Sequence, residues 1–346
     1  MTRVAPIRSL ANALSDWRRN LREYVVRRGT ELMCGTLMFQ SDPIATDFSI
    51  VGVGLRMTLL RALGAARIRS FTATSGLGHR FVCHIGDIAE YPFYFRKAYE
   101  KELELCAAWL RRDADPAMCD VGANDGFFSS HIAQMLADRK LQICAVEPVP
   151  PTFARLVQSV RRLGLEDRVQ PIAAAVVDVS RPVRVNFSQG KSLLSKVDLH
   201  EGAGRTTGDE TAICAGITLD ELCSQVAMTP SLVKIDVEGS EAAVLRGAKK
   251  LLSGGNRPAI LFEYSPFTLK QSGEKPEALV ELLRGNDIYY VDDFVGQKMP
   301  FGAPVGQFDK IQWTCNLFAV PTTDAASRQW ASALREARQR LGLEAA

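Results

Sequence analysis

Apolar and polar residues alternate along the middle of the chain in a way that predicts strands and helices in turn. Short apolar runs are followed by longer segments in which apolar residues recur every three or four positions, the spacing of an amphipathic helix. Such alternation predicts a parallel sheet covered by helices, whose ligands bind at the carboxyl ends of the strands. The predicted strands are 118–121, 141–146, 169–177, 232–237 and 259–262, and the predicted helices are 127–137, 151–163 and 241–252.

The two ends of the chain depart from this alternation. Residues 1–84 are Arg-rich, with apolar positions at helical spacing and two short strand-like segments, 70–73 and 80–84. We predict a partly helical extension over 1–84, in which the apolar helical faces of residues 1–70 cover an edge of the main domain or form a homodimer contact. The main domain then spans residues 85–325, and residues 326–346 form a C-terminal helix or tail. Within the main domain, the Gly- and Thr-rich segment 199–216 predicts a mobile loop.

Composition narrows the classes of partner. The 346 residues include 42 Lys and Arg against 39 Asp and Glu, a net charge of +3, so the chain has no electrostatic footprint for nucleic acid. No stretch is apolar enough for an integral membrane segment. Eight cysteines lack any metal-ligand spacing and fit a reducing compartment. These features predict a soluble, cytoplasmic protein whose partner is a small molecule or another protein.

The first candidate site is the stretch "CDVGANDG", residues 119–126. Gly122 and Gly126 separate a predicted strand from a predicted helix, where free N–H groups can meet a ligand. Glu147 ends the next strand, where a carboxylate can accept both hydroxyls of a ribose. The negative charge of Asp120 disfavours a pyrophosphate and suits a cationic group. Together these residues predict S-adenosylmethionine as cofactor, and a side chain added at Gly122 is expected to block binding while leaving the fold intact.

The second candidate site is "LVKIDVEGSE", residues 232–241. Strand alternation places Lys234, Asp236 and Glu238 on one face, and charges on a buried strand require a polar site. Glu263, at the end of the next strand, is expected to face the same cleft. We predict that Asp236 or Glu238 is a general base, with more weight on Asp236, and that Lys234 positions these carboxylates or the acceptor. The alternative is a structural ion cluster that closes the sheet edge.

Five ordered motifs resemble the FkbM family of S-adenosylmethionine-dependent methyltransferases over about residues 85–321: "DVGANDGFFSS", "AVEPVPPTFARL", "TLDEL", "LVKIDVEGSEAAVLRGAKKLL" and "NLFAVP". The resemblance implies a class I, Rossmann-like α/β fold: a mostly parallel seven-stranded sheet with a reversed last strand and helices on both faces. It also implies methyl transfer to a hydroxyl of a sugar, glycolipid, polyketide or other small molecule. By the same resemblance, the ribose is held by Glu147, the adenine lies near Asp178, and the methionine end is lined by Asp120, Gly122, Asn124 and Gly126.

Three alternatives stay open beside this interpretation. Asp236, Glu238 and Glu263 have the oxygen ligands that magnesium prefers, although the lysine partner favours a site without metal. An RNA ribose methyltransferase would use a Lys-Asp-Lys-Glu arrangement, but a second lysine is not evident and the charge balance is nearly neutral. A non-catalytic scaffold whose extension binds a protein would not need the charged strand face.

Overall fold

The computed structural model describes residues 66, 68–75, 77–85, 99–187, 196–198, 210–293 and 298–343. The chain divides into two units, Met1–Arg96 and Lys97–Ala346. In the first unit, β1 (Ser70–Thr74) and β2 (Arg80–His84) pair as an antiparallel hairpin. The predicted helical faces of the extension lie outside the described residues. Its boundary at residue 84, its role and the homodimer contact therefore stay predictions.

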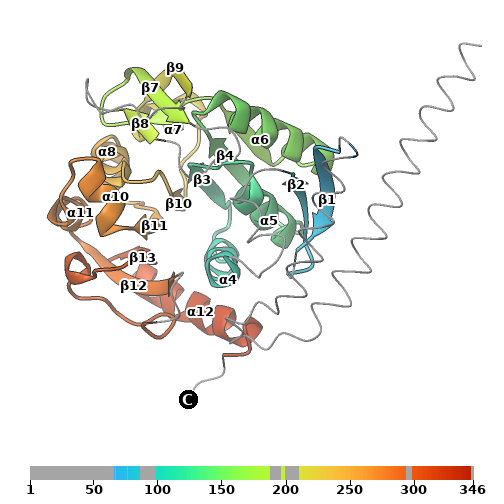
Figure 1. Ribbon diagram of the computed structural model, residues 1–346. Coiled ribbons are helices and arrows are strands. Elements are labelled where there is room, and N and C mark those ends of the chain that lie inside the picture. The colour runs from blue at the N-terminus through green and yellow to red at the C-terminus, as the bar shows by residue number, and fades with distance from the viewer. Residues whose placement is uncertain are drawn as a thin grey trace, which may run out of the picture. The chain divides into compact units, whose positions relative to one another are not determined.

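The second unit is built on a seven-stranded sheet with the order β12-β13-β11-β10-β3-β4-β5 (Figure 1). All neighbouring strands pair in parallel except β13, which runs antiparallel to both β11 and β12. This confirms the predicted α/β class and the reversed last strand. The strands are β3 (Ala117–Val121), β4 (Gln142–Val146), β5 (Val169–Ile172), β10 (Leu232–Ile235), β11 (Ala259–Tyr264), β12 (Asn286–Asp293) and β13 (Cys315–Pro321).

Helices cover both faces of this sheet, as predicted. On one face, the ring of Phe318 in β13 packs against Trp109 of α4 and Trp330 of α12. On the other face, side chains from α7, α8, α10 and α11 share one apolar core with alternate residues of the strands. The helices are α4 (Glu100–Leu110), α5 (Phe127–Met135), α6 (Pro150–Leu163), α7 (Leu219–Gln225), α8 (Glu241–Arg246), α9 (Lys249–Ser253), α10 (Pro266–Gln271), α11 (Pro276–Leu282) and α12 (Asp324–Arg340).

A second, four-stranded sheet was not predicted. Its order is β6-β9-β7-β8, with β6 (Ala175–Val176), β7 (Arg181–Phe187), β8 (Lys196–Asp198) and β9 (Glu210–Ile217). The predicted strand 169–177 is therefore two strands in different sheets. The predicted loop 199–216 is wrong from residue 210 onward, because this segment pairs with β7 as strand β9, although it is only partly buried and Ile213 is 75% exposed.

Strand register brings the polar residues of distant motifs to one edge of the seven-stranded sheet. Lys234 of β10 lies beside Asp120 of β3, and Ile235, the last residue of β10, lies beside Phe262 of β11. The residues that follow β10 therefore emerge between the ends of β3 and β11. None of the helices that the structure describes combines the length and hydropathy needed to cross a membrane.

Candidate active site

A buried lysine organises the candidate site. The ammonium of Lys234, a residue only 5% exposed, lies 3.2 Å from Asp120 Oδ1 and 3.4 Å from Asp236 Oδ2. The same ammonium lies 5.5 Å from the centre of the Phe128 ring. Burial lowers the pKa of Lys234, but the two carboxylates raise it by more. Lys234 therefore stays charged and binds strands β3 and β10 together at their carboxyl ends.

Asp236 presents its two oxygens to different surroundings. Oδ2 faces Lys234 and also accepts a hydrogen bond from the Tyr99 hydroxyl at 3.4 Å. Oδ1 has no hydrogen-bond or ion-pair partner among the residues that the structure describes, and the side chain is 23% exposed. One oxygen is thus fixed by donors, and the other is left for a group from outside the protein.

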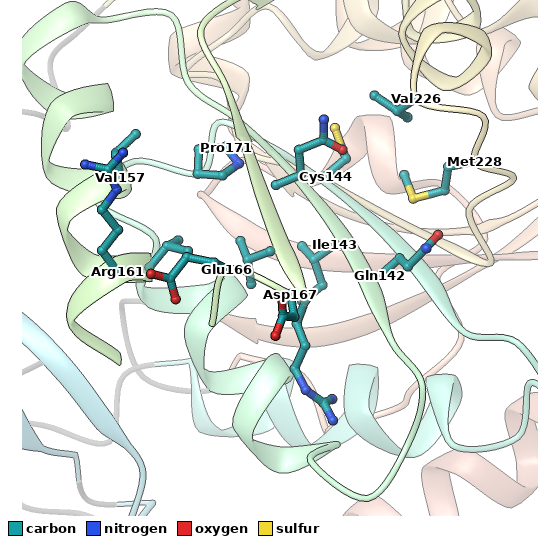
Figure 2. A pocket seen from close by; sticks show the side chains of 14 residues that line it. Gln142, Ile143, Cys144, Val157, Arg161, Glu166, Asp167, Pro171, Val226 and Met228 are labelled. Carbon is teal, nitrogen blue, oxygen red and sulfur yellow. The ribbon is translucent and has the colours of Figure 1, made fainter. Parts of the chain in front are cut away.

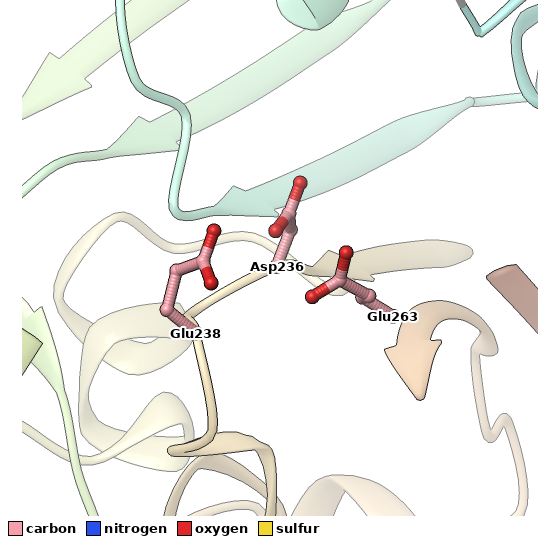
Figure 3. A group of neighbouring side chains, drawn as sticks. All are labelled: Asp236, Glu238 and Glu263. Atoms are coloured by element: carbon pink, nitrogen blue, oxygen red, sulfur yellow. The ribbon is translucent and has the colours of Figure 1, made fainter. Parts of the chain in front are cut away.

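Asp236, Glu238 and Glu263 gather their carboxylates at the same edge (Figure 3). One oxygen from each lies within 4.8 Å of the others. Burial, followed by the charges of Asp236 and Glu238, raises the pKa of Glu263 well above its usual value. Such oxygen atoms could also hold a hard divalent cation, and the metal-free site stays a prediction. The three carboxylates therefore lie together at one edge, as predicted, and Lys234 contacts one of them, Asp236.

The route by which Glu238 reaches this cluster differs from the predicted one. Strand β10 ends at Ile235, so strand alternation does not extend to Glu238. Glu238 instead adopts a left-handed backbone with φ of 52° in the turn before α8. The following Gly239 has φ of 101° and packs against the backbone of Thr268 in α10. A tight turn therefore returns Glu238 to the site.

Tyr99 is a site residue that sequence analysis missed. It precedes α4 and has φ of 58°, a left-handed conformation that costs a non-glycine residue about 1–2 kcal/mol. Its ring meets Phe128 edge-on, with ring centres 6.0 Å apart. A tyrosine ahead of an amphipathic helix carries no local signal for this role, because only the tertiary fold brings α4 to Asp236.

Behind the carboxylate cluster lies a second buried acid. Asn316 of β13 is the register partner of Glu263, and its amide donates to Glu102 Oε1 at 2.6 Å. Glu102 is 2% exposed, and burial raises its pKa to about 7. Asn316 therefore lies between Glu263, its register partner, and the buried carboxyl group of Glu102.

The packing of the fold leaves no room for side chains at the two glycines of the turn between β3 and α5. Gly122 has φ of 80°, and a methyl group added there would lie 1.9 Å from the backbone oxygen of Asp236. Gly126 has φ of 86°, and an added methyl group would lie 2.6 Å from a methyl group of Leu156. The expectation that a side chain at Gly122 leaves the fold intact is therefore wrong, because the backbone of Asp236, directly after β10, already occupies that space. Ligand contact by either glycine stays a prediction.

Glu147 fits the predicted ribose position. Its carboxylate follows β4, accepts the N–H groups of Asn124 at 3.0 Å and Val149 at 2.9 Å, and is 6% exposed. Burial raises its pKa to about 7, although the two N–H groups oppose this. Each oxygen keeps a lone pair, so a diol could add two hydrogen bonds and favour the ionised form. The residues present therefore fit a ribose.

The remaining predicted cofactor residues lie in different settings. Asp120 has no exposed surface, and its Oδ2 accepts a hydrogen bond from Ser129 at 2.6 Å. Asp178 lies in the turn between β6 and β7, where its carboxylate pairs with Arg181 at 2.9 Å. Burial raises the pKa of Asp178, but Arg181 outweighs this and the net shift is downward. Cofactor contact by Asp120, Asn124 or Asp178 stays a prediction.

A separate hollow of about 520 Å³ lies near the amino ends of β4 and β5 (Figure 2). Gln142, Ile143 and Cys144 of β4 line it together with Val226 and Met228. The predicted site residues are all missing from its lining, and the ligands of parallel sheets bind at the opposite strand ends. We therefore do not place the cofactor there.

The sheet order, the reversed strand and the polar carboxyl edge define a class I methyltransferase domain. Residues 120–289 match the sequence model of the methyltransferase FkbM domain. The chain therefore carries a methyltransferase FkbM domain over these residues, and the resemblance inferred from its motifs is confirmed. S-adenosylmethionine is the cofactor, as predicted.

Similarity to solved structures is low. The methyltransferase FkbM from Methylobacillus flagellatus KT aligns with 14% identity and a TM-score of 0.38, over 60% of this chain and 44% of that one. This chain thus spans less than half of that structure. A SAM-dependent methyltransferase from Agrobacterium tumefaciens aligns with 11% identity and a TM-score of 0.38, over 72% and 69% of the two chains. No curated protein matches the sequence.

Proposed function

We propose that the protein is an O-methyltransferase that acts on a hydroxyl of a small molecule, such as a sugar, a glycolipid or a polyketide. S-adenosylmethionine, when bound, supplies an activated methyl group. The protein must then align the acceptor hydroxyl behind that methyl group and remove the hydroxyl proton, and alignment alone can supply much of the rate. A carboxylate within hydrogen-bond reach of the hydroxyl performs the second task.

The unpartnered oxygen of Asp236 is the observation that carries this proposal. Oδ2 is held by Lys234 and Tyr99, whereas Oδ1 is free among the described residues and the side chain is partly exposed. Asp236 Oδ1 therefore accepts the hydroxyl proton as the new C–O bond forms. Lys234, which stays charged, holds Asp236 Oδ2 in place.

Glu238 and Glu263 are proposed to bind the acceptor. Glu238 accepts a hydrogen bond from a second hydroxyl, which suits an acceptor rich in hydroxyl groups. Glu263, whose pKa is raised well above its usual value by burial and by neighbouring carboxylates, can donate a hydrogen bond to the acceptor in its protonated form. Cofactor binding is proposed for Glu147 at the ribose, for Asp178 near the adenine, and for the turn that contains Asp120, Gly122, Asn124 and Gly126.

The negative charge of the site favours this proposal over methylation of RNA. The cluster of acidic groups of Asp236, Glu238 and Glu263 disfavours a phosphate backbone, and Lys234, the cation that contacts it in the described part of the chain, is buried. A neutral polyol suffers no such repulsion.

The seven cysteines in the part of the chain that the structure describes are free thiols, which supports a reducing, cytoplasmic location.

The test is transfer of labelled methyl from S-adenosylmethionine to a panel of methyl glycosides, nucleotide sugars, phenols and transfer RNA. Methylation of a hydroxylated small molecule by the wild-type protein, with loss of that activity in Asp236→Asn, is the expected result. Transfer to RNA alone would replace the proposal with the nucleic-acid alternative. Tight binding of S-adenosylmethionine without any transfer would favour the scaffold alternative.

A further inference from the structure

We propose that Tyr99 is a positioning residue of this site, which holds one oxygen of Asp236 so that the other can accept the proton. The inference rests on the proposed function, because it assigns a partner to the proposed base. Nothing in the motifs of the chain points to Tyr99. The assignment comes from its backbone conformation and its place in the fold.

Two donors converge on a single oxygen of Asp236. The Tyr99 hydroxyl and the Lys234 ammonium each lie 3.4 Å from Oδ2. A carboxylate held by one donor can still rotate to exchange its oxygens. Two donors from different elements, one ahead of α4 and one on β10, fix which oxygen faces inward, so Oδ1 is the oxygen presented to the acceptor.

The Tyr99 ring is itself fixed. It packs edge-on against Phe128 at an interplanar angle of 86°, and the Lys234 ammonium lies over the ring of the same Phe128. Phe128 therefore contacts both donors of Asp236 Oδ2. Through these two contacts, Phe128 fixes the positions of the phenol and the ammonium relative to each other, so the Asp236 carboxylate keeps one orientation.

The backbone of Tyr99 argues that the side chain is needed. With φ of 58° and ψ of 20°, this position favours glycine or asparagine on local grounds. Strained residues of this kind concentrate at functional sites, where surrounding contacts maintain them. Burial, followed by the charge of Asp236, raises the pKa of the phenol well above its usual value, so the hydroxyl keeps its proton and remains a donor.

The test compares four proteins: wild type, Tyr99→Phe, Asp236→Asn and the double variant. Each is assayed with the hydroxylated panel member that the wild-type protein methylates fastest. Tyr99→Phe keeps the ring on Phe128 and should therefore fold, which melting by circular dichroism will check. We expect kcat to fall about 10- to 100-fold in Tyr99→Phe, the range for a hydrogen bond to a charged group. KM for the acceptor and the Kd for S-adenosylmethionine should change less than twofold.

The double variant distinguishes positioning from an independent effect. If Tyr99 acts through Asp236, adding Tyr99→Phe to Asp236→Asn should slow turnover no further. Tyr264→Phe is the matched control, because it also removes a buried hydroxyl with hydrogen bonds of 3.4 Å, but these reach the backbone of residues 309 and 311. That control should leave kcat unchanged.

Two outcomes would overturn the inference. The first is wild-type kcat in Tyr99→Phe, and the second is a full additional loss in the double variant. A wild-type protein that methylates nothing in the panel would instead overturn the proposed function, and the role of Tyr99 with it.

Discussion

The α-carbon of Gly122 faces the backbone carbonyl of Asp236 so closely that a methyl group on Gly122 would lie 1.9 Å from that oxygen. The contact joins the turn after β3, where the cofactor is proposed to bind, to the residue proposed as base. The missing side chain therefore lets two functional segments approach each other. A movement of either segment would therefore change the packing of the other.

Substitution of Gly122 by alanine should destabilise the fold by about 2–5 kcal/mol, because overpacking adds to the cost of a left-handed backbone. Urea denaturation measures the loss. Gly164→Ala is the control, since Gly164 has φ of 68° but open space around it, and should cost only about 1 kcal/mol. Equal losses of unfolding free energy in Gly122→Ala and Gly164→Ala would show that the close contact with Asp236 does not add to the cost of a side chain at Gly122.

Replacing Asp236 by asparagine should lower kcat by about 100- to 10,000-fold, the usual contribution of a general base. Affinity for S-adenosylmethionine should change little, because the proposed cofactor contacts lie on the turn after β3 and at the end of β4. Radiolabelled turnover and calorimetry measure the two quantities. Asp287→Asn, on the exposed side of β12, is the control and should behave as wild type.

Glu238→Gln separates the base from an acceptor-binding group. If Glu238 binds a second hydroxyl, its amide should raise KM for the acceptor more than it lowers kcat. A kcat loss as large as that of Asp236→Asn would transfer the role of base to Glu238. Near-normal turnover in both Asp236→Asn and Glu238→Gln would show that neither carboxylate accepts the proton.

Glu147→Ala should weaken S-adenosylmethionine binding by about 1.5–3 kcal/mol, the scale of hydrogen bonds to a charged group. The variant also frees the N–H groups of Asn124 and Val149, so a drop in melting temperature should accompany the loss of affinity. Titration calorimetry on protein shown to be folded keeps the two effects apart. Glu166→Ala, an exposed carboxylate, is the control, and unchanged affinity in Glu147→Ala would reject the ribose assignment.

Stability should depend on pH through Glu102. Its pKa rises from 4.5 unfolded to about 7 folded because of burial, so the folded state binds more protons between these values. The stabilising contribution of the protonated form is complete below about pH 4.5 and is lost as pH rises through 7.

Glu102→Gln mimics the protonated acid and should remove this dependence. Relative to wild type, the variant should be similar in stability at pH 4.5 and more stable at pH 8, by an amount on the order of 1–3 kcal/mol. Urea denaturation at the two pH values measures it. A stability difference that does not grow with pH would show that Glu102 is ionised in the folded protein.

The amino-acid sequence by itself determined the main features of the α/β sheet and the residues of its polar edge. Apolar runs around Met118, Ile143, Val233 and Ile260 predict buried parallel strands, because such strands are covered on both faces and need continuous hydrophobicity. The charges that interrupt or follow these runs then identify the functional edge. Lys234, Asp236 and Glu263 were found in this way.

Tertiary structure decided what depends on neighbours distant in the chain. The Gly- and Thr-rich composition of residues 199–216 predicts a loop, whereas β9 is a strand because it pairs with β7. Gly122 is required by the carbonyl of Asp236, and Tyr99 meets Asp236 across 137 positions of sequence. Local pattern records which face of an element is buried, but it does not record which element lies opposite, and at this site the opposite element sets both the packing and the hydrogen bonds.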